Sequence, residues 1–451
     1  MTQIEYRAYS PSGSTSQVRH LLRYAFHLYG FLFMVLFLCV ADQALGHAGL
    51  LPINATALCA ILLAPFMLRG CLKASSKTHG VPVLIEAFWR NRLVIISLSL
   101  IALVALLWSS VPTAYWGEDG KWIAVIPYDV CIALCSMSLG VYPWRNGELR
   151  LVIFTSLLAL LGSLWYDMLY PGTFAELGNR SAGFPGNANF AALVAVVLCA
   201  SGLDFGDNHR SSPSSNSLLL NTLFLLCSFL VVTITMSRSG LINFFGVLLA
   251  YGYFRLIRSS APVRRRLQEV LILAGLATLA ALLVLWIGAL GTSTESDSRL
   301  VRFLNNQQVD DGSAATRLAA VHDSIRLIED SPWVGHGTGF ARTMSELPHN
   351  LYLQQWVNNG IAGFFAYLFF LVVTFHSFSA RSYRNGQVLT LVATIGSIFS
   401  HNVLDQRPFL ILIGLFLADS QMNPARFVFG INYSQFRRKR NFGKPTLYHT
   451  E

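Results

Sequence analysis

The stretch RLVIISLSLIALVALLWSS at residues 92–110 decides the fold class, because its only charge is at its first position. A transmembrane α-helix needs about 20 mostly apolar residues, so this stretch predicts a helix that crosses a membrane. The whole chain has the same character: of its 451 residues, 53% are hydrophobic and 12% are charged. Soluble domains carry about 25% charged residues. This composition excludes a soluble multidomain protein and an intrinsically disordered chain.

Eleven further apolar runs predict an all-α polytopic membrane protein with about twelve transmembrane helices. The first run follows about 20 polar residues and is long enough to span, so we expect it to stay in the protein rather than be cleaved as a signal peptide. The runs lie at 21–41, 50–69, 122–141, 150–169, 186–204, 217–236, 239–257, 268–291, 357–379, 388–404 and 407–421.

The same pattern divides the chain into five segments. They are an N-terminal segment at 1–20, nine spans within 21–291, a long outer loop at 292–356, three spans within 357–421 and a basic tail at 422–451.

The basic residues predict the orientation of the chain. With twelve spans, 24 of the 33 lysines and arginines fall on the side of both termini. Because positive residues are enriched on the cytoplasmic side, we expect both termini in the cytoplasm and the long loop in the periplasm of a bacterial inner membrane. The net charge of +10 and the tail RRKR at 437–440 therefore indicate contacts with lipid headgroups rather than with nucleic acid.

Several classes of site are absent from the sequence. It has no G-x-S-x-G elbow, no H-E-x-x-H and no P-loop. None of the seven cysteines lies in the long loop, so no exported disulfide framework is expected. The spacing of His322, His336 and His349 matches no metal-ligand pattern. We therefore expect no metal and no other cofactor.

The long loop is the most informative polar segment. Leu318, Val321, Ile325 and Ile328 recur at helical spacing, which predicts an amphipathic helix at 314–330 that lies on the membrane or on the other helices. The glycine-rich turn GHGTGF follows at 335–340, and a second helix begins near Pro348 and continues into the tenth span.

Four arginines lie where outer loops meet apolar runs, namely Arg180, Arg238, Arg317 and Arg407. A charged residue at membrane depth normally faces a cavity or a partner, and arginine binds phosphate oxygens through its fork of donors. Arginines beside lipid suit a lipid-linked phosphate or diphosphate. The alternatives are that Arg238 extends to the headgroups, or that the arginines pair with Glu176, Asp405 or Glu118.

His349 is the candidate general base, because a neutral imidazole on the outer face can accept a proton near pH 7. The alternative is an ordinary polar surface residue. His401, with Asp405 and Arg407 just beyond it, forms a second polar cluster that lines the same cavity or only closes the bundle. Three further polar residues in the same outer segments are expected to bind substrate: Asn187, Ser237 and Asn350.

The sequence resembles the bacterial O-antigen ligase and O-antigen polymerase superfamily over residues 150–420. The resemblance rests on NRSAGFPGNANFAA at 179–192, TMSRSGLINFF at 235–245, TRLAAVHDSIRLIEDSPWVGHGTGF at 316–340 and PHNLYLQQWVNNGIAG at 348–363. The order of these segments and their placement between spans are those of the family. Ser239 and Ala188 stand where the family often has glycine and proline, and neither departure removes a charged group.

The resemblance implies a GT-C-like, metal-independent, inverting glycosyltransferase. Such proteins move a glycan from undecaprenyl diphosphate to an acceptor on the periplasmic side. The acceptor is the lipid A core in the ligases, another carrier-linked repeat in the polymerases and a pilin in a related branch. The family's two diphosphate-binding arginines map onto Arg180 and Arg238, and its loop histidine maps onto His349. The sequence favours the ligase and leaves the other two acceptors open.

Two other classes of function are weighed against this one. A secondary transporter of an anionic solute would use the arginines as its binding site, but transporters usually show internal repeats. This chain shows none, and its polar residues are concentrated in one asymmetric loop. A non-catalytic scaffold predicts that Arg180, Arg238 and His349 are individually dispensable.

Overall fold

The protein is described by a computed structural model, in which the regular elements are helices. The residues described are 14–47, 55–73, 81–115, 122–142, 144, 147–170, 173–174, 181–205, 215–257, 263–264, 266–272, 275, 278, 312–381, 383–401 and 403–419. The elements are α1 (Ser14–Leu38), α2 (Ala41–His47), α3 (Ala55–Leu72), α4 (Val83–Arg90), α5 (Arg92–Trp108), α6 (Trp122–Gly140), α7 (Glu148–Leu169), α8 (Ala188–Gly202), α9 (Ser215–Ile234), α10 (Arg238–Gly252), the π-helix η1 (Tyr253–Ile257), α13 (Gly312–Asp330), the 3₁₀ helix η2 (Phe340–Thr343), α14 (Leu351–Ala380), α15 (Arg384–Phe399) and α16 (Arg407–Ala418).

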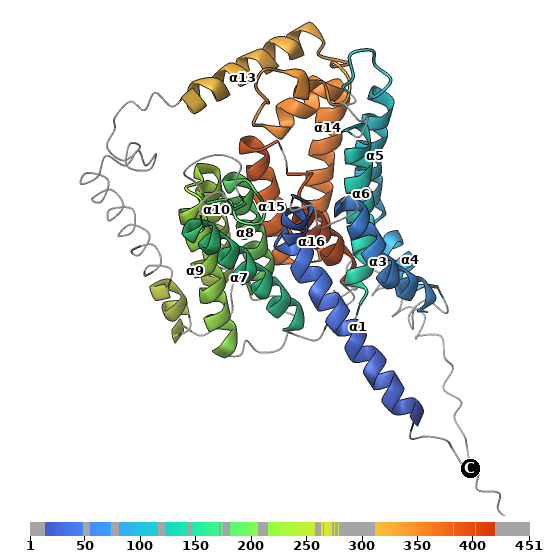
Figure 1. Cartoon of the computed structure of the whole chain (residues 1–451), viewed down its shortest axis with the longest axis vertical. Coiled ribbons are helices and arrows are strands. Elements are labelled where there is room, and N and C mark those ends of the chain that lie inside the picture. The colour runs from blue at the N-terminus through green and yellow to red at the C-terminus, as the bar shows by residue number, and fades with distance from the viewer. Residues whose placement is uncertain are drawn as a thin grey trace, which may run out of the picture.

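The long helices run beside one another as a bundle, and α13 lies across one end of it (Figure 1). We call this the α13 end. The first turns of α8, α10, α14 and α16 lie at the α13 end, and the last turns of α3, α6 and α14 lie at the opposite end. Helix α1 extends beyond the bundle at that opposite end.

The all-helical fold is as predicted, while the number of spans remains a prediction. Among the described residues, five helices are long and apolar enough to cross a membrane: α1, α7, α9, α10 with η1, and α14. A sixth arises if α4 and α5, bent by 78°, form one broken span. Helices α3, α6, α8 and α16 are apolar but shorter. Most of the predicted ninth run, residues 292–311 of the long loop and the basic tail lie outside the described residues.

The amphipathic helix of the long loop is present as α13, but only part of its apolar stripe is covered by the rest of the protein. Leu318 is 60% exposed and Ile325 is 45% exposed, whereas Ala320 and Ser324 are buried. Ala320 and Ser324 therefore form the protein contact of α13, Val321 and Ile328 are half-buried, and Leu318 and Ile325 face away from the other helices.

Small residues allow the central helices to pack closely. Every residue of α8 from Ala191 to Gly202 is buried, between α7, α9, α10 and α15. A Cβ on Gly414 of α16 would lie 2.2 Å from the carbonyl oxygen of Ala133 in α6. Without a solvent-driven hydrophobic effect between membrane helices, such close backbone contact is a main source of their association.

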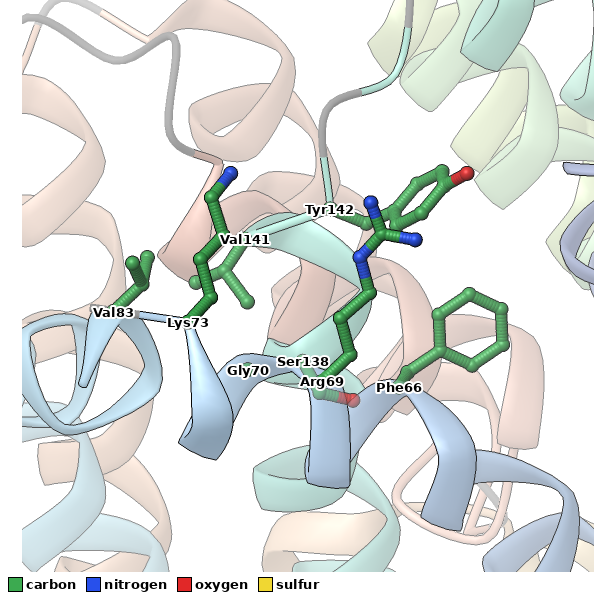
Figure 2. Close-up of a pocket in the computed structure, with 8 residues that line it drawn as sticks. All are labelled: Phe66, Arg69, Gly70, Lys73, Val83, Ser138, Val141 and Tyr142. Carbon is green, nitrogen blue, oxygen red and sulfur yellow. The ribbon is translucent and has the colours of Figure 1, made fainter. Parts of the chain in front are cut away.

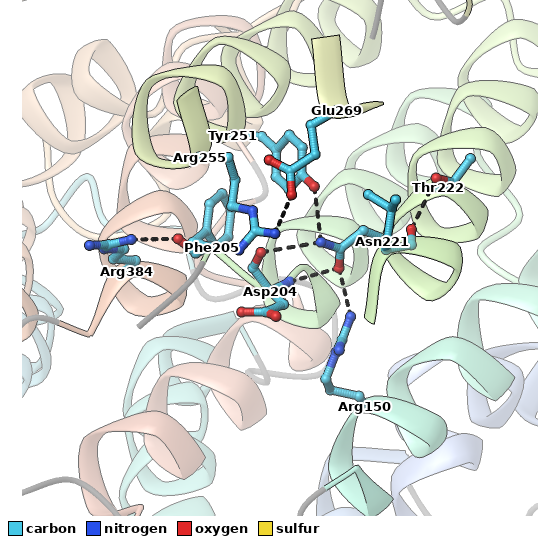
Figure 3. A network of polar contacts seen from close by, with 10 residues as sticks. Arg150, Asp204, Phe205, Asn221, Thr222, Tyr251, Arg255, Glu269 and Arg384 are labelled. Atoms are coloured by element: carbon cyan, nitrogen blue, oxygen red, sulfur yellow. Dashed lines mark hydrogen bonds and ion pairs between the residues drawn. The ribbon is translucent and has the colours of Figure 1, made fainter. Parts of the chain in front are cut away.

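The far end of α8 is held by polar side chains from three other helices (Figure 3). Arg150 of α7 donates to the carbonyl of Gly202 (2.8 Å) and to Oδ1 of Asn221 in α9 (2.6 Å). Arg384 donates to the carbonyl of Phe205. Asn385 donates to the carbonyls of Ala200, Ser201 and Leu203, at 3.2, 2.9 and 2.7 Å. The last carbonyls of a helix have no partner within it, so these side chains fix α8 along its axis.

The same network extends to the end of α10. Asn221 donates to the hydroxyl of Tyr251 (3.0 Å), and Arg255 in η1 forms a buried ion pair with Glu269 (Figure 3). The opposite end of the bundle therefore contains a connected set of polar contacts between helices.

Candidate functional site

The glycine-rich turn predicted at 335–340 is fixed against a break in α14. Asn359 and Gly360 have non-helical backbone angles, and Gly360 has φ of 60°. The break exposes backbone carbonyls, and the turn uses them: His336 N–H donates to Val357 O and Gly337 N–H to Asn358 O, both at 2.8 Å. Gly335, Gly337 and Gly339 all have positive φ, which glycine adopts without steric cost.

The turn is also bound to the end of α5. The Thr338 hydroxyl contacts Ala105 O (2.6 Å) and Oδ1 of Asn359 (2.8 Å). The indole of Trp108 donates to Val334 O. The His336 ring contacts Leu327 O at 2.9 Å and stacks on Phe340, so His336 has a packing role. These contacts hold α13 and the start of α14 in one position relative to the bundle.

His349 lies at the α13 end, one residue before the N-cap of α14. The cap is Asn350, whose side chain accepts from the N–H groups of Tyr352 (2.9 Å) and Leu353 (3.1 Å). His349 is half-buried. Its ring lies beside that of His401, which follows α15, with 5.4 Å between ring centroids. The second polar cluster of the sequence therefore lies next to the predicted base.

The surroundings of His349 favour its neutral form. Burial lowers the pKa of His349 below its usual value, the nearby charge of Arg317 lowers it further, and Glu346 opposes the shift. Burial also lowers the pKa of His401 to about 4, with smaller contributions from His349 and Arg342. Both rings are neutral near pH 7, so each can accept a proton.

Sequence reasoning did not single out Arg342 as part of the site. Arg342 lies within η2, and its guanidinium is 3.7 Å from the carboxylate of Asp405. Burial lowers the pKa of Arg342, and Asp405 opposes this. The only signal in the sequence was its place in the long loop just after the glycine-rich turn.

Ser237 and Arg238 begin α10, and Asn187 caps α8 at the same end of the bundle. The Ser237 hydroxyl accepts from Gly240 N–H (3.1 Å), and Asn187 Oδ1 accepts from the N–H groups of Asn189 and Phe190, at 2.9 and 3.2 Å. The first turns of these two helices touch, since a Cβ on Gly240 would lie 2.5 Å from that of Ala192. The side chain of Arg238 is exposed.

Arg180 lies outside the described residues, but the chain just after it is anchored. Asp167, buried near the end of α7, accepts from the N–H groups of Ala182 (2.8 Å) and Gly183 (3.4 Å). The hydroxyl of Ser163 accepts from Phe184 N–H (3.1 Å). Asp167 therefore anchors Ala182 and Gly183 to the end of α7, a role the sequence analysis did not assign.

Arg407 forms an ion pair that the sequence did not predict. Its partner is the fully buried Asp42 of α2, at 2.8 Å, rather than Asp405. Burial raises the pKa of Asp42 to about 6, and the charge of Arg407 opposes this rise. Asp42 is therefore largely ionised at neutral pH, and the pair joins α2 to the start of α16.

The comparisons with known proteins bear on the segment that holds this geometry. A family model described as O-Antigen ligase matches residues 223–368. The matched segment begins within α9 and ends within α14, so it contains Arg238, Arg317, Arg342 and His349. No curated protein matches the chain. The segment at 223–368 is therefore similar to the O-antigen ligase family, in agreement with the resemblance found in the sequence.

Proposed function

We propose that the protein is an inverting glycosyltransferase that moves a glycan from undecaprenyl diphosphate to the lipid A core on the periplasmic face of the inner membrane. The observation that carries this proposal is the half-buried His349, kept neutral beside Arg317 at the end of the bundle where α10 begins with Arg238. The similarity to this family supports a membrane glycosyltransferase in general, and this arrangement supports the specific chemistry.

The proposed reaction is a single displacement. His349 accepts the proton of the acceptor hydroxyl while the hydroxyl oxygen forms a bond to the anomeric carbon of the donor glycan. The bond from that carbon to the diphosphate oxygen breaks, and the diphosphate leaves with the electron pair. Attack from the face opposite the leaving group inverts the anomeric centre.

Charge develops on the departing oxygen, and stabilising it is where fixed positive groups contribute most. Arg180 and Arg238 have this role in the proposal. Arg317 binds a substrate phosphate or sugar and keeps His349 neutral. Asn187, Ser237 and Asn350 have their side-chain oxygens engaged as caps, so they would offer substrate their remaining donor groups. Arg407 is paired with Asp42, so it would contact the substrate only at the edge of the site.

The test is complementation of a bacterial strain that lacks its own O-antigen ligase, with lipopolysaccharide resolved on a gel. We expect wild type to restore glycan ladders on the lipid A core and His349→Ala to abolish them, because general-base catalysis contributes about 10²–10⁴-fold. Arg180→Ala and Arg238→Ala should lose about 10²–10³-fold, as for other groups that stabilise a developing anion.

His322→Ala is the matched control, because His322 is an exposed histidine of the same loop on α13 and should leave the ladders intact. If well-expressed wild type gives no ladders, the lipid A core is not the acceptor. The protein would then be a polymerase or a pilin-glycan ligase, and each of these is tested with its own acceptor. Ladders that survive all three substitutions would refute the proposed site.

A further inference from the structure

A groove at the opposite end of the bundle has no part in the proposed reaction. It lies where the last turn of α3 meets the start of α4 and the end of α6 (Figure 2). Its lining consists of Phe66, Arg69, Gly70, Lys73, Val83, Ser138, Val141 and Tyr142. Gly70 brings the helices together here, since a Cβ on it would lie 3.2 Å from Leu84 and 3.3 Å from Val141.

Two cationic side chains line the groove without a carboxylate partner. Arg69 and Lys73 are four residues apart, a spacing that places side chains on one helix face, and Figure 2 shows both extending to the same side of α3. The Arg69 guanidinium lies 4.9 Å from the ring centroids of both Phe26 and Tyr142. Among the described residues, no acidic group pairs with Arg69 or Lys73.

The acidic residues nearby already have other partners. Glu86 pairs with Arg90 at 3.1 Å, and Glu148 pairs with His27 at 3.9 Å. The positive charge of the groove is therefore not neutralised by these two carboxylates, and an anion from outside the chain would be attracted to it.

The aromatic ring of Tyr142 forms one wall of the groove beside Arg69. This side chain is only 4% exposed, and its hydroxyl has no hydrogen-bond partner. Buried hydroxyl groups are normally hydrogen-bonded, and an exception needs an explanation such as a missing ligand or water. This hydroxyl points away from Lys73 (Figure 2), so the ring of Tyr142, and not its hydroxyl, faces the cationic pair.

The surroundings of the groove distinguish a lipid from a soluble anion. Leu68 is 62% exposed, Leu72 is 76% exposed and Trp89 is 70% exposed, so apolar side chains flank the cationic pair. A free phosphate has no apolar part that could contact this surface. A phospholipid has a phosphate for Arg69 and Lys73 and acyl chains for the leucines. Basic pockets between transmembrane helices bind such headgroups in other membrane proteins.

We propose that this groove binds the headgroup phosphate of an anionic phospholipid from the surrounding bilayer. The phosphate lies between the Arg69 guanidinium and the Lys73 ammonium, and the acyl chains run along Leu68 and Leu72. The lipid would join α3 to α4 and α6 at the end of the protein away from the proposed reaction.

The test measures binding of short-chain phosphatidylglycerol to the full-length protein purified in a zwitterionic detergent. Phosphatidylcholine of the same chain length and inorganic phosphate are the comparison ligands. Each basic residue near a membrane contributes about fivefold to the binding of an anionic lipid. Lys73→Gln should therefore weaken phosphatidylglycerol binding about fivefold, and Arg69→Gln with Lys73→Gln about 25-fold.

Tyr142→Phe keeps the ring beside Arg69 and removes only a hydroxyl that points away from Lys73, so it should bind phosphatidylglycerol as wild type does. The matched control replaces two exposed arginines toward the same end, Arg23→Gln with Arg92→Gln, and should bind as wild type does. Since Lys73 is exposed and Tyr142→Phe is conservative, both single variants should fold even if Arg69→Gln does not. An equal loss of phosphatidylglycerol binding in the control pair would mean that the lipid is attracted by the overall positive charge of the protein rather than by this groove. Equally tight phosphatidylcholine or free phosphate would also overturn the proposal.

Discussion

The electrostatic environment of His349 is set by two residues of opposite charge in the same loop. Arg317 lowers the pKa of His349 and Glu346 raises it, while burial lowers it most. A general base works only when it is unprotonated. The lower its pKa, the further into acid the activity persists, so the acid limb of the pH–rate profile should follow the pKa of His349.

We expect Arg317→Gln to move this acid limb to higher pH, because loss of the positive charge raises the pKa of His349. Glu346→Gln should move it to lower pH, because loss of the negative charge lowers that pKa. The measurement is kcat/KM against pH with purified enzyme. His401→Gln tests whether the acid limb belongs to His349. The pKa of His401 is already about 4, so the acid limb should stay at the same pH in this variant. Shifts of the same sign in both charge variants would contradict the assignment.

Three of the predicted substrate-binding residues have an evident structural role as well. Asn187, Ser237 and Asn350 each cap the first turn of a helix, and loss of such a cap costs about 1 kcal/mol. A drop in activity after Ser237→Ala therefore includes a loss of helix stability. Asn187→Asp and Asn350→Asp retain the capping oxygen while they replace the amide donor by a negative charge, which should repel an anionic substrate without loss of the cap.

At the scale of elements, the break in α14 is the feature that attaches the loop to the bundle. Gly360 occupies it with φ of 60°, and a Cβ there would lie 2.2 Å from the carbonyl oxygen of Trp333. The break and the turn at 335–339 therefore depend on each other.

Gly360→Ala should destabilise the protein by about 1–3 kcal/mol from backbone strain alone. It should also abolish transfer, because the turn must leave the break and His349 then loses its position. The measurements are thermal unfolding in detergent and the complementation assay. Gly162→Ala is the control: it is a helical glycine with no atom within 4 Å of the added Cβ. Its stability should stay the same or rise by about 0.5–1 kcal/mol, and an unchanged Gly360→Ala protein would refute this account.

The far end of α8 is a second place where elements are joined by polar contacts. Asn385 donates from its one amide group to two carbonyls of α8 and to that of Leu203, which follows the helix. Asn385→Ala leaves these acceptors with fewer partners and should cost about 1–3 kcal/mol, seen as a lower melting temperature. Gln387→Ala, two residues along α15, is the control and should melt as wild type does. Transfer by the folded fraction should be normal, because the contact lies far from His349. A loss of activity beyond the loss of folded protein would show that the position of α8 affects the geometry of the site around His349.

At the scale of the whole molecule, the two ends of the bundle differ in their polar chemistry. The α13 end holds the histidine pair and arginines near exposed loops, while the opposite end holds connected networks and the groove at Arg69. The orientation inferred from the basic residues assigns the α13 end to the periplasm.

Labelling of intact cells with a membrane-impermeant maleimide tests this orientation. His322→Cys on α13 should react in intact cells. The native, exposed Cys71 at the end of α3 should react only after the inner membrane is permeabilised. Mass spectrometry of the labelled peptides separates the two sites within one sample. Reaction of Cys71 in intact cells, with protection of His322→Cys, would reverse the orientation and place His349 in the cytoplasm.

The sequence alone was sufficient to predict the features that depend on residues close together in the chain. Long apolar runs predicted helices, and the described runs fall on helices. Asn187 and Ser237 precede two of them, and Pro348 marks the start of α14 closely. The length of an apolar run and the cap before it are local properties, so no knowledge of the fold was needed. The family, too, was recognisable from short segments in order.

Only the tertiary structure decided which residues meet. His349 lies beside His401, Arg407 pairs with Asp42 rather than Asp405, and the glycine-rich turn occupies a break that periodicity did not reveal in α14. Apolar membrane helices resemble one another in sequence, so hydropathy does not specify which of them are neighbours. Which helices become neighbours depends on small residues, buried polar groups and backbone breaks that lie far apart in the chain. These features fit one another only when the helices have packed together.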